Sequence, residues 1–254
     1  MLLDSGQGTN RAVHLDPVAS SALDHEQIPA HIGVVMDGNG RWANERGLKR
    51  TSGHEAGEIS LCEAVDGALE AGVQWLTVYA FSTENWKRPP EEVKFLINFN
   101  REVLTRRRDE FNEKGVRIRF IGRRDWRVPK RLIRDMDAAA DLTASNRKLT
   151  LTIAFNYGGR AEIVDAVRAL AESGVAPAKI TEAAISKHLY APDVPDPELV
   201  IRTSGESRIS NFLLWELAYS ELVFCDVLWP DFRSGHLFAS ILEFQQRQRR
   251  FGGV

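Results

Sequence analysis

The stretch HIGVVMDGNGRWA, residues 31–43, decides the fold class. Its first six residues are mostly apolar and β-branched, which is typical of a short buried strand. The strand leads directly into Asp37 and two glycines, which let backbone N–H groups approach an anion at a helix N-terminus. The stretch therefore predicts a strand, a phosphate-binding turn and a helix, in that order.

Five further segments have strand character, and helix-length segments connect most of them. The strand segments are QWLTVYAF (74–81), VRIRFIG (116–122), KLTLTIAF (148–155), ELVIRT (198–203) and ELVFCDVLW (221–229). Helices are expected over 90–114, 129–146, 159–173 and 234–250. This alternation predicts a single α/β domain with a mostly parallel six-stranded sheet, whose ligands bind beyond the carboxyl ends of the strands.

The composition is that of an ordinary globular chain. There are 33 Lys and Arg against 35 Asp and Glu, a net charge of −2, so no strongly basic surface indicates a nucleic-acid partner. Cys62 and Cys225 are too few for a disulfide framework, which favours a reducing cytoplasm. Residues 1–27 lack hydrophobic periodicity and are expected to be a flexible extension before a domain over 28–254. We expect neither a membrane anchor nor a signal peptide.

The turn after the first strand combines a carboxylate with donors for an anion. Asp37 would repel a bound phosphate unless a cation lay between them, and Mg²⁺ takes one or two carboxylates together with phosphate oxygens and water. Arg41, Arg50 and His54 follow closely and supply the donors that a diphosphate needs. The alternative is an Asp that caps the strand beside surface arginines.

The same turn also matches a dinucleotide fingerprint in Gly38-x-Gly40-x-x-Ala43, so a nucleotide-dependent oxidoreductase is a competing interpretation. A dinucleotide site needs an acid at the end of the second strand, about 20 residues further on. The corresponding acid here is Glu84, much further along the chain, and Asp37 lies where the pyrophosphate would bind. Both observations favour a phosphate site of another kind.

Two more strand ends carry polar clusters. The segment after strand 74–81 contains Ser82, Thr83, Glu84, Asn85, Trp86 and Arg88, for which a helix cap with a packed Trp is the structural alternative. The segment after strand 198–203 contains Arg208 and Ser210, with Arg202 at the strand end, and suits a second anion. Glu221 opens the last strand and is a candidate second metal carboxylate, although a solvated Glu is common there.

The motifs HIGVVMDGNGRWA, GHEAG, TVYAFSTENWKRP, FNYGGR and LVIRTSGESRISNFLLWELAYSEL resemble those of the cis-prenyltransferases, the undecaprenyl or decaprenyl diphosphate synthase family, over about residues 28–253. The resemblance implies a homodimeric α/β fold with an apolar tunnel. It implies a cytoplasmic, Mg²⁺-dependent enzyme that condenses isopentenyl diphosphate onto an allylic diphosphate, farnesyl or geranyl diphosphate. The product would be a Z-polyprenyl diphosphate, delivered to the membrane as the precursor of a cell-wall lipid carrier.

The resemblance also implies roles for single residues. Asp37 would be the Mg²⁺-linked carboxylate with Glu221 as the second, and Asn85 matches the position assigned to proton removal. Because a neutral amide is a weak base, Asn85 could instead orient the substrate while a diphosphate oxygen takes the proton. The implied substrate contacts are Gly38, Asn39, Gly40, Arg41, Trp42, Arg50 and His54 for the allylic diphosphate, Ser82, Thr83, Glu84, Trp86 and Arg88 in the second motif, and Arg202, Arg208, Ile209 and Ser210 for isopentenyl diphosphate.

Three features bear on variation within that family. Arg250 and Gly252 match a tail that reaches the partner subunit's site, and Ser207 stands where some members have His, which leaves no metal role there. The small Ala80, near the expected tunnel, favours a medium or long product over the alternative of a short one. A non-catalytic accessory subunit is the remaining alternative, which the presence of Asp37 and Asn85 disfavours.

Overall fold

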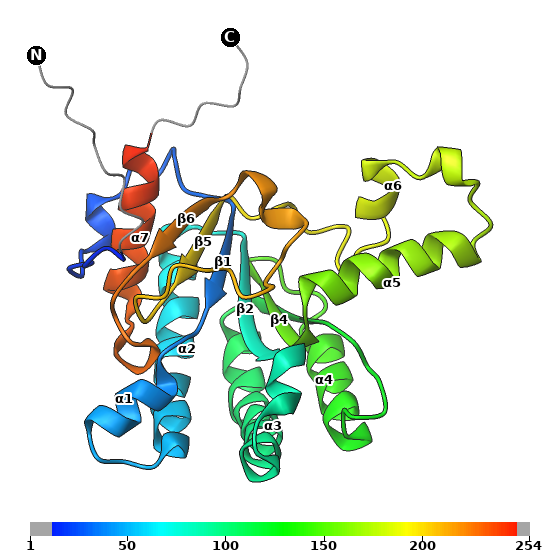
Figure 1. The fold of residues 1–254 in the computed structure, drawn as a ribbon. Coiled ribbons are helices and arrows are strands. Elements are labelled where there is room, and N and C mark those ends of the chain that lie inside the picture. The colour runs from blue at the N-terminus through cyan, green and yellow to red at the C-terminus, as the bar shows by residue number, and fades with distance from the viewer. Residues whose placement is uncertain (1–11, 248–254) are drawn as a thin grey trace, which may run out of the picture.

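The computed structural model describes residues 12–247 and contains one six-stranded sheet with all strands parallel (Figure 1). The strand order is β3-β4-β2-β1-β5-β6. The strands are β1 (His31–Val35), β2 (Trp75–Ser82), β3 (Val116–Ile121), β4 (Leu149–Tyr157), β5 (Leu199–Arg202) and β6 (Glu221–Phe224). This confirms the predicted α/β class, and the order differs from the 3-2-1-4-5-6 arrangement of the dinucleotide-binding fold.

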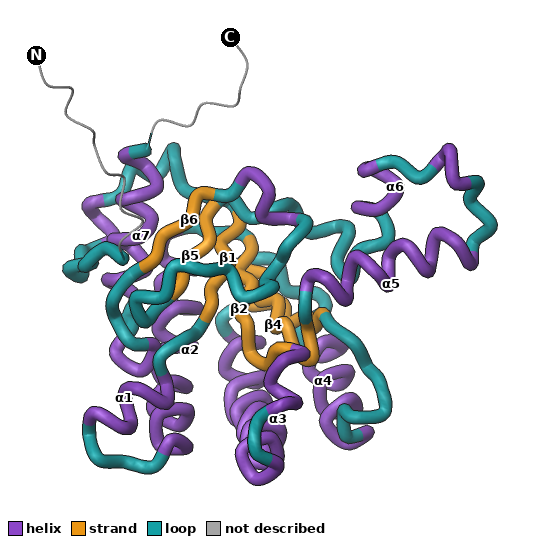
Figure 2. The backbone as a smooth tube through the Cα atoms, viewed as in Figure 1, coloured by secondary structure: helices purple, strands orange, loops and turns teal. Residues whose placement is uncertain are grey.

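Helices cover the sheet, with α2, α3 and α4 together on one side of it (Figures 1 and 2). The α-helices are α1 (Asn39–Glu45), α2 (Arg50–Ala71), α3 (Pro90–Glu113), α4 (Lys130–Leu142), α5 (Gly159–Glu172), α6 (Glu182–Ser186) and α7 (Ser234–Gln246). Short 3₁₀ helices are η1 (Ser20–Ala22), η2 (Thr83–Lys87), η3 (Pro177–Lys179), η4 (Glu216–Tyr219) and η5 (Trp229–Asp231). The helix predicted after the glycine turn is α1, and the four other predicted helices are confirmed within the described residues as α3, α4, α5 and α7, whereas α2 and α6 were not predicted. None of the described helices is long and apolar enough to span a membrane.

The main hydrophobic core lies between the sheet and the helices on that side. It contains apolar residues of β1, β2, β3 and β4 together with residues of α2, α3, α4 and α7. Every residue of β1 is buried, as expected for a strand inside a parallel sheet that is covered on both faces. The carboxyl ends of the strands are therefore fixed firmly, and the loops that follow them are held in place.

Two segments differ from the sequence-based expectation. Residues 12–27, expected within a flexible extension, pack on the domain: Val13 pairs with Cys225, and both Leu15 and Leu23 are buried. Their apolar residues are too few and too widely spaced to show periodicity. The last strand is also shorter than predicted, because the chain turns after Phe224. Beyond this turn, the Trp229 N–H donates to the Asp37 carbonyl oxygen at 3.0 Å.

Candidate active site

Three loops meet at one edge of the sheet. They follow β1, β2 and β5, and because β1 lies between the other two strands, the residues after all three strand ends become neighbours. The loop after β5 has left-handed backbone at Ser204, Ser210 and Asn211, which turns it sharply back over the strand ends. The structure thus brings together the three segments that the sequence marked as candidates.

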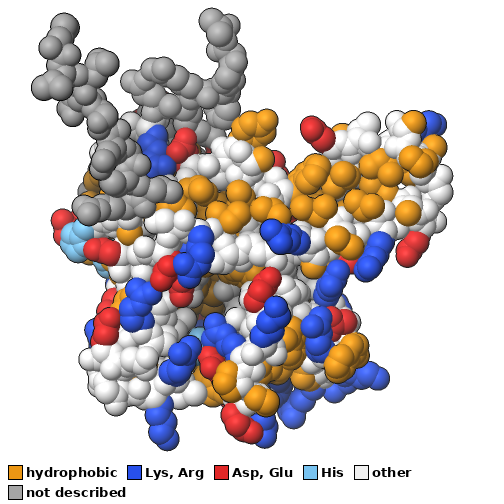
Figure 3. Space-filling model, viewed as in Figure 1, with side chains coloured by type: hydrophobic (Ala, Val, Ile, Leu, Met, Phe, Trp, Pro, Cys, Tyr) orange, Lys and Arg blue, Asp and Glu red, His pale blue; other side chains and the backbone are white. Residues whose placement is uncertain are grey.

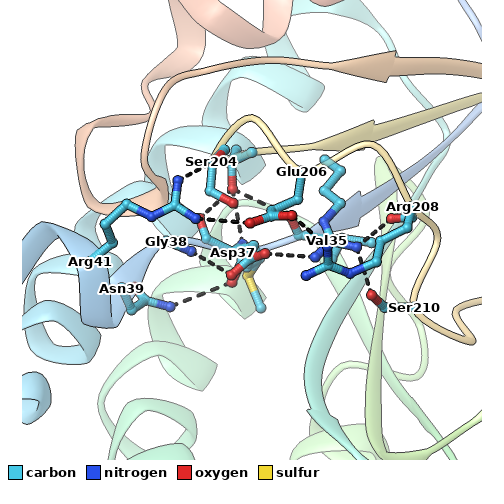
Figure 4. A network of polar contacts seen from close by, with 12 residues as sticks. Val35, Asp37, Gly38, Asn39, Arg41, Ser204, Glu206, Arg208 and Ser210 are labelled. Carbon is cyan, nitrogen blue, oxygen red and sulfur yellow. Dashed lines mark hydrogen bonds and ion pairs between the residues drawn. The ribbon is translucent and has the colours of Figure 1, made fainter. Parts of the chain in front are cut away.

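Asp37 lies at the centre of a network of polar contacts at this edge (Figure 4), and its main partner is Arg202. Asp37 Oδ2 accepts a hydrogen bond from Arg202 Nη2 at 2.7 Å, and Oδ1 accepts one from the Gly38 N–H at 2.8 Å. Burial disfavours the charged form of Asp37, but the bond to Arg202 and its positive charge outweigh that effect and lower the pKa of the carboxyl. Asp37 is therefore a carboxylate at neutral pH.

Arg202 is held almost entirely by protein groups. Its side chain is 5% exposed, and it also donates to Ser210 Oγ at 2.6 Å and to the Arg208 carbonyl oxygen. Its Nε is buried with no partner among the described residues, so one N–H of the guanidinium remains for a ligand.

The glycine turn leaves room where a side chain would not fit. Gly38 has φ of 108°, and a Cβ there would lie 3.0–3.1 Å from Leu228 and Ser204. A Cβ at Gly40 would lie 3.1 Å from the guanidinium of Arg50. Asn39 Oδ1 beside this turn is buried and accepts no hydrogen bond from residues 12–247. Glycine at both positions therefore lets Leu228, Ser204 and the Arg50 guanidinium approach the backbone of the turn closely.

Carboxylates that the sequence analysis did not single out accompany the arginines. Glu92 accepts from Arg88 at 2.7 Å and from Arg50 at 3.5 Å. Glu206 pairs with Arg41 at 3.1 Å and with Arg208. These two carboxylates pair with four arginines and therefore offset only part of their positive charge. Glu92 could have been found from the sequence, because it lies in the first turn of the predicted helix 90–114 and four residues after Arg88.

His54 does not add a positive charge to the site. Burial, assisted by the charge of Arg88, lowers its pKa to about 4. The ring lies near Phe95 and Phe99, with centroid separations of 6.2 and 6.3 Å. At neutral pH, the uncharged ring of His54 therefore has one N–H that can donate to an anion, and its other ring nitrogen is an acceptor.

The second motif forms a capping box at the start of η2. Asn85 Oδ1 accepts from the Ser82 N–H at 2.9 Å, and the Asn85 N–H donates to Ser82 Oγ at 3.2 Å. Glu84 accepts from Thr83 Oγ1 at 3.1 Å and from Asn211 Nδ2 at 3.0 Å. The acceptor oxygen of Asn85 is thus already used within the protein.

Trp86 has a structural position. Its indole N–H donates to Asn156 Oδ1 at 2.7 Å, and its ring contacts Phe81 edge to face. Trp86 lines neither of the two cavities described next. Trp42 likewise donates to Asp231 at 2.7 Å and stacks under Arg46, outside both cavities. Both indole N–H groups are thus bonded within the protein, and Trp86 lines a third cavity beside Arg88.

A polar pocket and an apolar tunnel join at this edge. The polar pocket, about 470 Å³, is lined mainly by Ser82, Glu84, Arg202, Ser210 and Asn211. The apolar tunnel, about 210 Å³, starts at Asn39, Gly40, Arg50 and His54 and continues between the sheet and α3 as far as Phe111, Leu132 and Met136. Both are lined by Met36, Asp37, Tyr79, Asn85 and Arg88. The site can hold two anionic groups side by side, one of them attached to a hydrocarbon chain.

Glu221 lies away from this site, contrary to the pairing with Asp37 that we expected. It is the first residue of β6 and pairs with Arg247 at 2.9 Å. The strand register aligns Glu221 with Leu199 and Leu199 with Ile32, so Asp37 lies five residues further along, or about 16 Å at 3.3 Å per residue. Within one chain the two carboxylates cannot share a Mg²⁺ ion. The first residue of a parallel strand always faces the edge opposite its last, so the sequence already contained this information.

Other expected residues have mixed positions. Neither cavity is lined by Arg41 on α1, Thr83 in η2, or Arg208 and Ile209 in the loop after β5. Arg250 and Gly252 lie outside the described residues. Tyr79 and Asn211 were missed by the sequence analysis, although both line the polar pocket. Tyr79 stands within the strand segment 74–81 among mostly apolar residues, so the sequence pattern does not mark it as a pocket residue.

Comparisons with known proteins agree with this geometry. The family model described as "Putative undecaprenyl diphosphate synthase" matches residues 35–252. A trans,polycis-polyprenyl diphosphate synthase of Thermobifida fusca is 54% identical over 91% of this chain and 83% of that protein, and a decaprenyl diphosphate synthase of Mycolicibacterium smegmatis is 52% identical over 94% and 83%. The structure of lavandulyl diphosphate synthase from Lavandula x intermedia superposes with a TM-score of 0.85 at 32% identity, covering 90% of this chain and 100% of that one. These matches, together with the joined pocket and tunnel, show that the chain belongs to the cis-prenyltransferase family of undecaprenyl and decaprenyl diphosphate synthases.

Proposed function

We propose that this chain is a Z-polyprenyl diphosphate synthase that adds isopentenyl diphosphate repeatedly to a farnesyl or geranyl diphosphate primer and makes a medium- to long-chain product. The observation that carries the proposal is the junction of a polar pocket with an apolar tunnel at Asp37 and Asn85. An accessory subunit would not need this arrangement, and Asp37, Asn85, Arg202 and Arg208 are all present.

The two diphosphates have different places in this proposal. Isopentenyl diphosphate binds in the polar pocket, where Arg202 and Ser210 face it. The allylic diphosphate binds at the tunnel mouth, beside the glycine turn, Arg50 and Arg88, and its hydrocarbon chain enters the tunnel. Because each isoprene unit buries more apolar surface, at about 0.8 kcal/mol per CH₂, elongation is favoured while space remains.

The residues promote the reaction by fixed positive charge. Breaking the allylic carbon–oxygen bond places negative charge on the leaving diphosphate, and the arginines held by Glu92 and Asp37 are oriented for it in advance. The double bond of isopentenyl diphosphate then attacks C1, and loss of a proton from its C2 gives the Z double bond. Because Asn85 uses its amide oxygen in the capping box, we assign it to orientation and assign proton acceptance to a diphosphate oxygen.

The residues present fit one Mg²⁺ ion at Asp37. No group of three or more His, Cys, Asp or Glu side chains among the described residues could hold a metal, so Asp37 would be its main protein ligand. That is the usual pattern for Mg²⁺, which keeps water and binds substrate phosphates with one or two carboxylates. When bound, the ion would neutralise charge that develops on the diphosphate. A contribution from Glu221 would have to come from a second copy of the chain.

We also propose that two copies form a homodimer. Helix α5 exposes Val164 and Val167, and Figure 3 shows hydrophobic side chains gathered over this helix. A second copy that covers this surface would remove the apolar area from water. The tail residues Arg250 and Gly252 would then be available to the partner's isopentenyl site.

A cytoplasmic location completes the proposal. Cys62 and Cys225 are free thiols, which is usual in reducing compartments. The hydrocarbon product would pass to the membrane, where we propose that it becomes a cell-wall lipid carrier.

The test is incubation with labelled isopentenyl diphosphate, farnesyl or geranyl diphosphate and Mg²⁺, followed by butanol extraction and chain-length measurement. We expect extractable labelled product, and an absence of label in butanol would overturn the function. Asp37→Ala should keep the circular dichroism spectrum but lose about 10²–10³-fold in turnover. The matched control Asp137→Ala removes an exposed, ion-paired carboxylate on α4 and should leave turnover unchanged. An Asp37→Ala variant within a few-fold of wild type would refute the role of Asp37.

A further inference from the structure

Charged side chains interrupt the wall of the apolar tunnel where α2 faces the second half of α3. Glu58 and Arg107 line the tunnel there, among Leu61, Leu104 and Phe111. Charges beside an apolar cavity are costly unless they are paired, because they lose their hydration. Their position therefore needs an explanation that packing alone does not give.

One carboxylate joins the two helices. Glu58 Oε2 accepts from Arg106 Nη2 at 2.6 Å, and Oε1 accepts from Arg107 Nε at 2.7 Å and from Arg106 Nε at 3.3 Å. Glu58 is on α2 and is only 9% exposed, whereas both arginines are on α3. We call Glu58, Arg106 and Arg107 the Glu58 clamp.

The clamp is the thin part of the tunnel wall. The Arg106 and Arg107 side chains are 48% and 32% exposed, so one layer of side chains separates the tunnel from solvent there. The deep end, in contrast, is formed by Phe111, Leu132 and Met136, which are nearly completely buried in the core. A hydrocarbon chain that fills the tunnel thus meets a packed core at its end and the clamp at its side.

We propose that the Glu58 clamp is a specificity determinant for product length, a polar gate between α2 and α3 that the growing hydrocarbon chain does not pass. This rests on the proposed synthase function. To pass, the chain would have to separate Glu58 from both arginines and leave a nearly buried carboxylate unpaired against hydrocarbon. Growth therefore stops when the space inside the closed clamp is filled.

The same two helices offer a matched control. Lys114 on α3 donates to Asp66 on α2 at 2.6 Å, further along the contact between these two helices, which we call the seam. Neither residue lines the tunnel. Asp66→Ala removes this link but leaves the contacts of Glu58 in place, together with Glu110, which joins Lys114 to Arg107. Glu58→Ala therefore removes an ion pair that faces the tunnel, whereas Asp66→Ala removes one that does not.

The experiment measures product chain length and total labelled isopentenyl diphosphate incorporated, for wild type, Glu58→Ala, Glu58→Gln and Asp66→Ala. We expect Glu58→Ala to shift the products toward greater length by at least one isoprene unit, because the gate opens. Glu58→Gln, which keeps the size but not the charge, should shift them in the same direction by less. Asp66→Ala should give the wild-type distribution.

An unchanged distribution in both Glu58 variants, with label still incorporated, would overturn the gate. The same lengthening in Asp66→Ala would also overturn it, since general loosening of the seam would then be sufficient. If Glu58→Ala does not fold, Glu58→Gln decides alone. Absence of incorporation by the wild type would contradict the synthase function instead, so the two failures are distinguishable.

Discussion

Arg202 shows how single residues prepare this site before any substrate arrives. Its guanidinium is bonded to Asp37, Ser210 and the Arg208 carbonyl oxygen, so little reorganisation is needed when a diphosphate binds beside it. Glu92 holds Arg50 and Arg88 in a similar way at the tunnel mouth. An incoming diphosphate therefore meets arginines that are already oriented, and it competes with Glu92 for their N–H groups.

Asn85→Asp separates an orienting role from a basic one. The carboxylate keeps an oxygen that can accept from the Ser82 N–H, so the capping box and the unfolding temperature should change little. It also adds a negative charge beside the diphosphates, and we expect turnover to fall more than about tenfold. Labelled-product assays and thermal unfolding measure both effects. Wild-type or greater turnover would show instead that this position removes the proton.

The buried His54 predicts a pH-dependent stability. Its pKa is about 4 in the folded chain against an ordinary value of 6.5, because burial and nearby arginines disfavour the charged ring. The unfolded chain therefore takes up a proton first as pH falls. His54 therefore makes its full contribution to the free energy of unfolding above pH 6.5. As the pH falls toward 4, up to about 3 kcal/mol of that contribution is lost.

Urea unfolding of wild type and His54→Gln, from about pH 7.5 to about pH 4.5, measures this effect. The variant should lose less stability than the wild type over this interval. Other groups titrate in both proteins, so the difference between the two slopes isolates His54. Equal slopes would mean that the ring takes up its proton equally in the folded and unfolded states.

At the scale of elements, the strands were predictable and the least periodic segments were not. Strand β1 and its neighbours are continuous apolar runs, whose signal survives without any tertiary information. Helix α2 was missed because many of its buried positions are Gly, Ala or Ser, which gives no apolar stripe.

The loops of the site show the same division. Their order could be predicted, because polar residues after parallel strands meet at one edge. The partners of the arginines depend on loop conformation, and Glu206 reaches Arg41 only because the loop after β5 turns back. The packing of residues 12–27 likewise depends on a bridge between Val13 and Cys225, which are remote in sequence.

Strand β2 supplies a prediction about the tunnel. Ala80 lines the tunnel, and Ala80→Leu would place extra methyl and methylene groups in it. We expect shorter products, while the exposed Ala144 after α4 serves as a control, since Ala144→Leu adds the same groups outside the tunnel. Chromatography of the extracted products compares the lengths. An unchanged distribution for Ala80→Leu would show that the growing chain does not pass this position.

At the scale of the whole molecule, the net charge of −2 conceals a local arrangement. At one edge of the sheet, arginines pair with Asp37, Glu92 and Glu206. Exposed apolar side chains lie elsewhere, among them Val164 and Val167 on α5, which extends away from the sheet in Figure 1. The molecule thus separates the surface suited to substrates from the one suited to a second copy.

The proposed homodimer can be tested at that second surface. Val164 and Val167 on α5 are 46% and 39% exposed, and Val164→Asp/Val167→Asp would place two carboxylates in an apolar contact. Light scattering should give twice the 28.5 kDa chain mass for the wild type and the single mass for the double variant. Leu142→Asp, at a site 44% exposed at the end of α4, should remain a dimer. Because all three side chains are exposed in the single chain, the unfolding temperature of the monomer should change little in each variant. A monomeric wild type would contradict the homodimer. A double variant that remains dimeric would show that the contact between the two copies lies elsewhere.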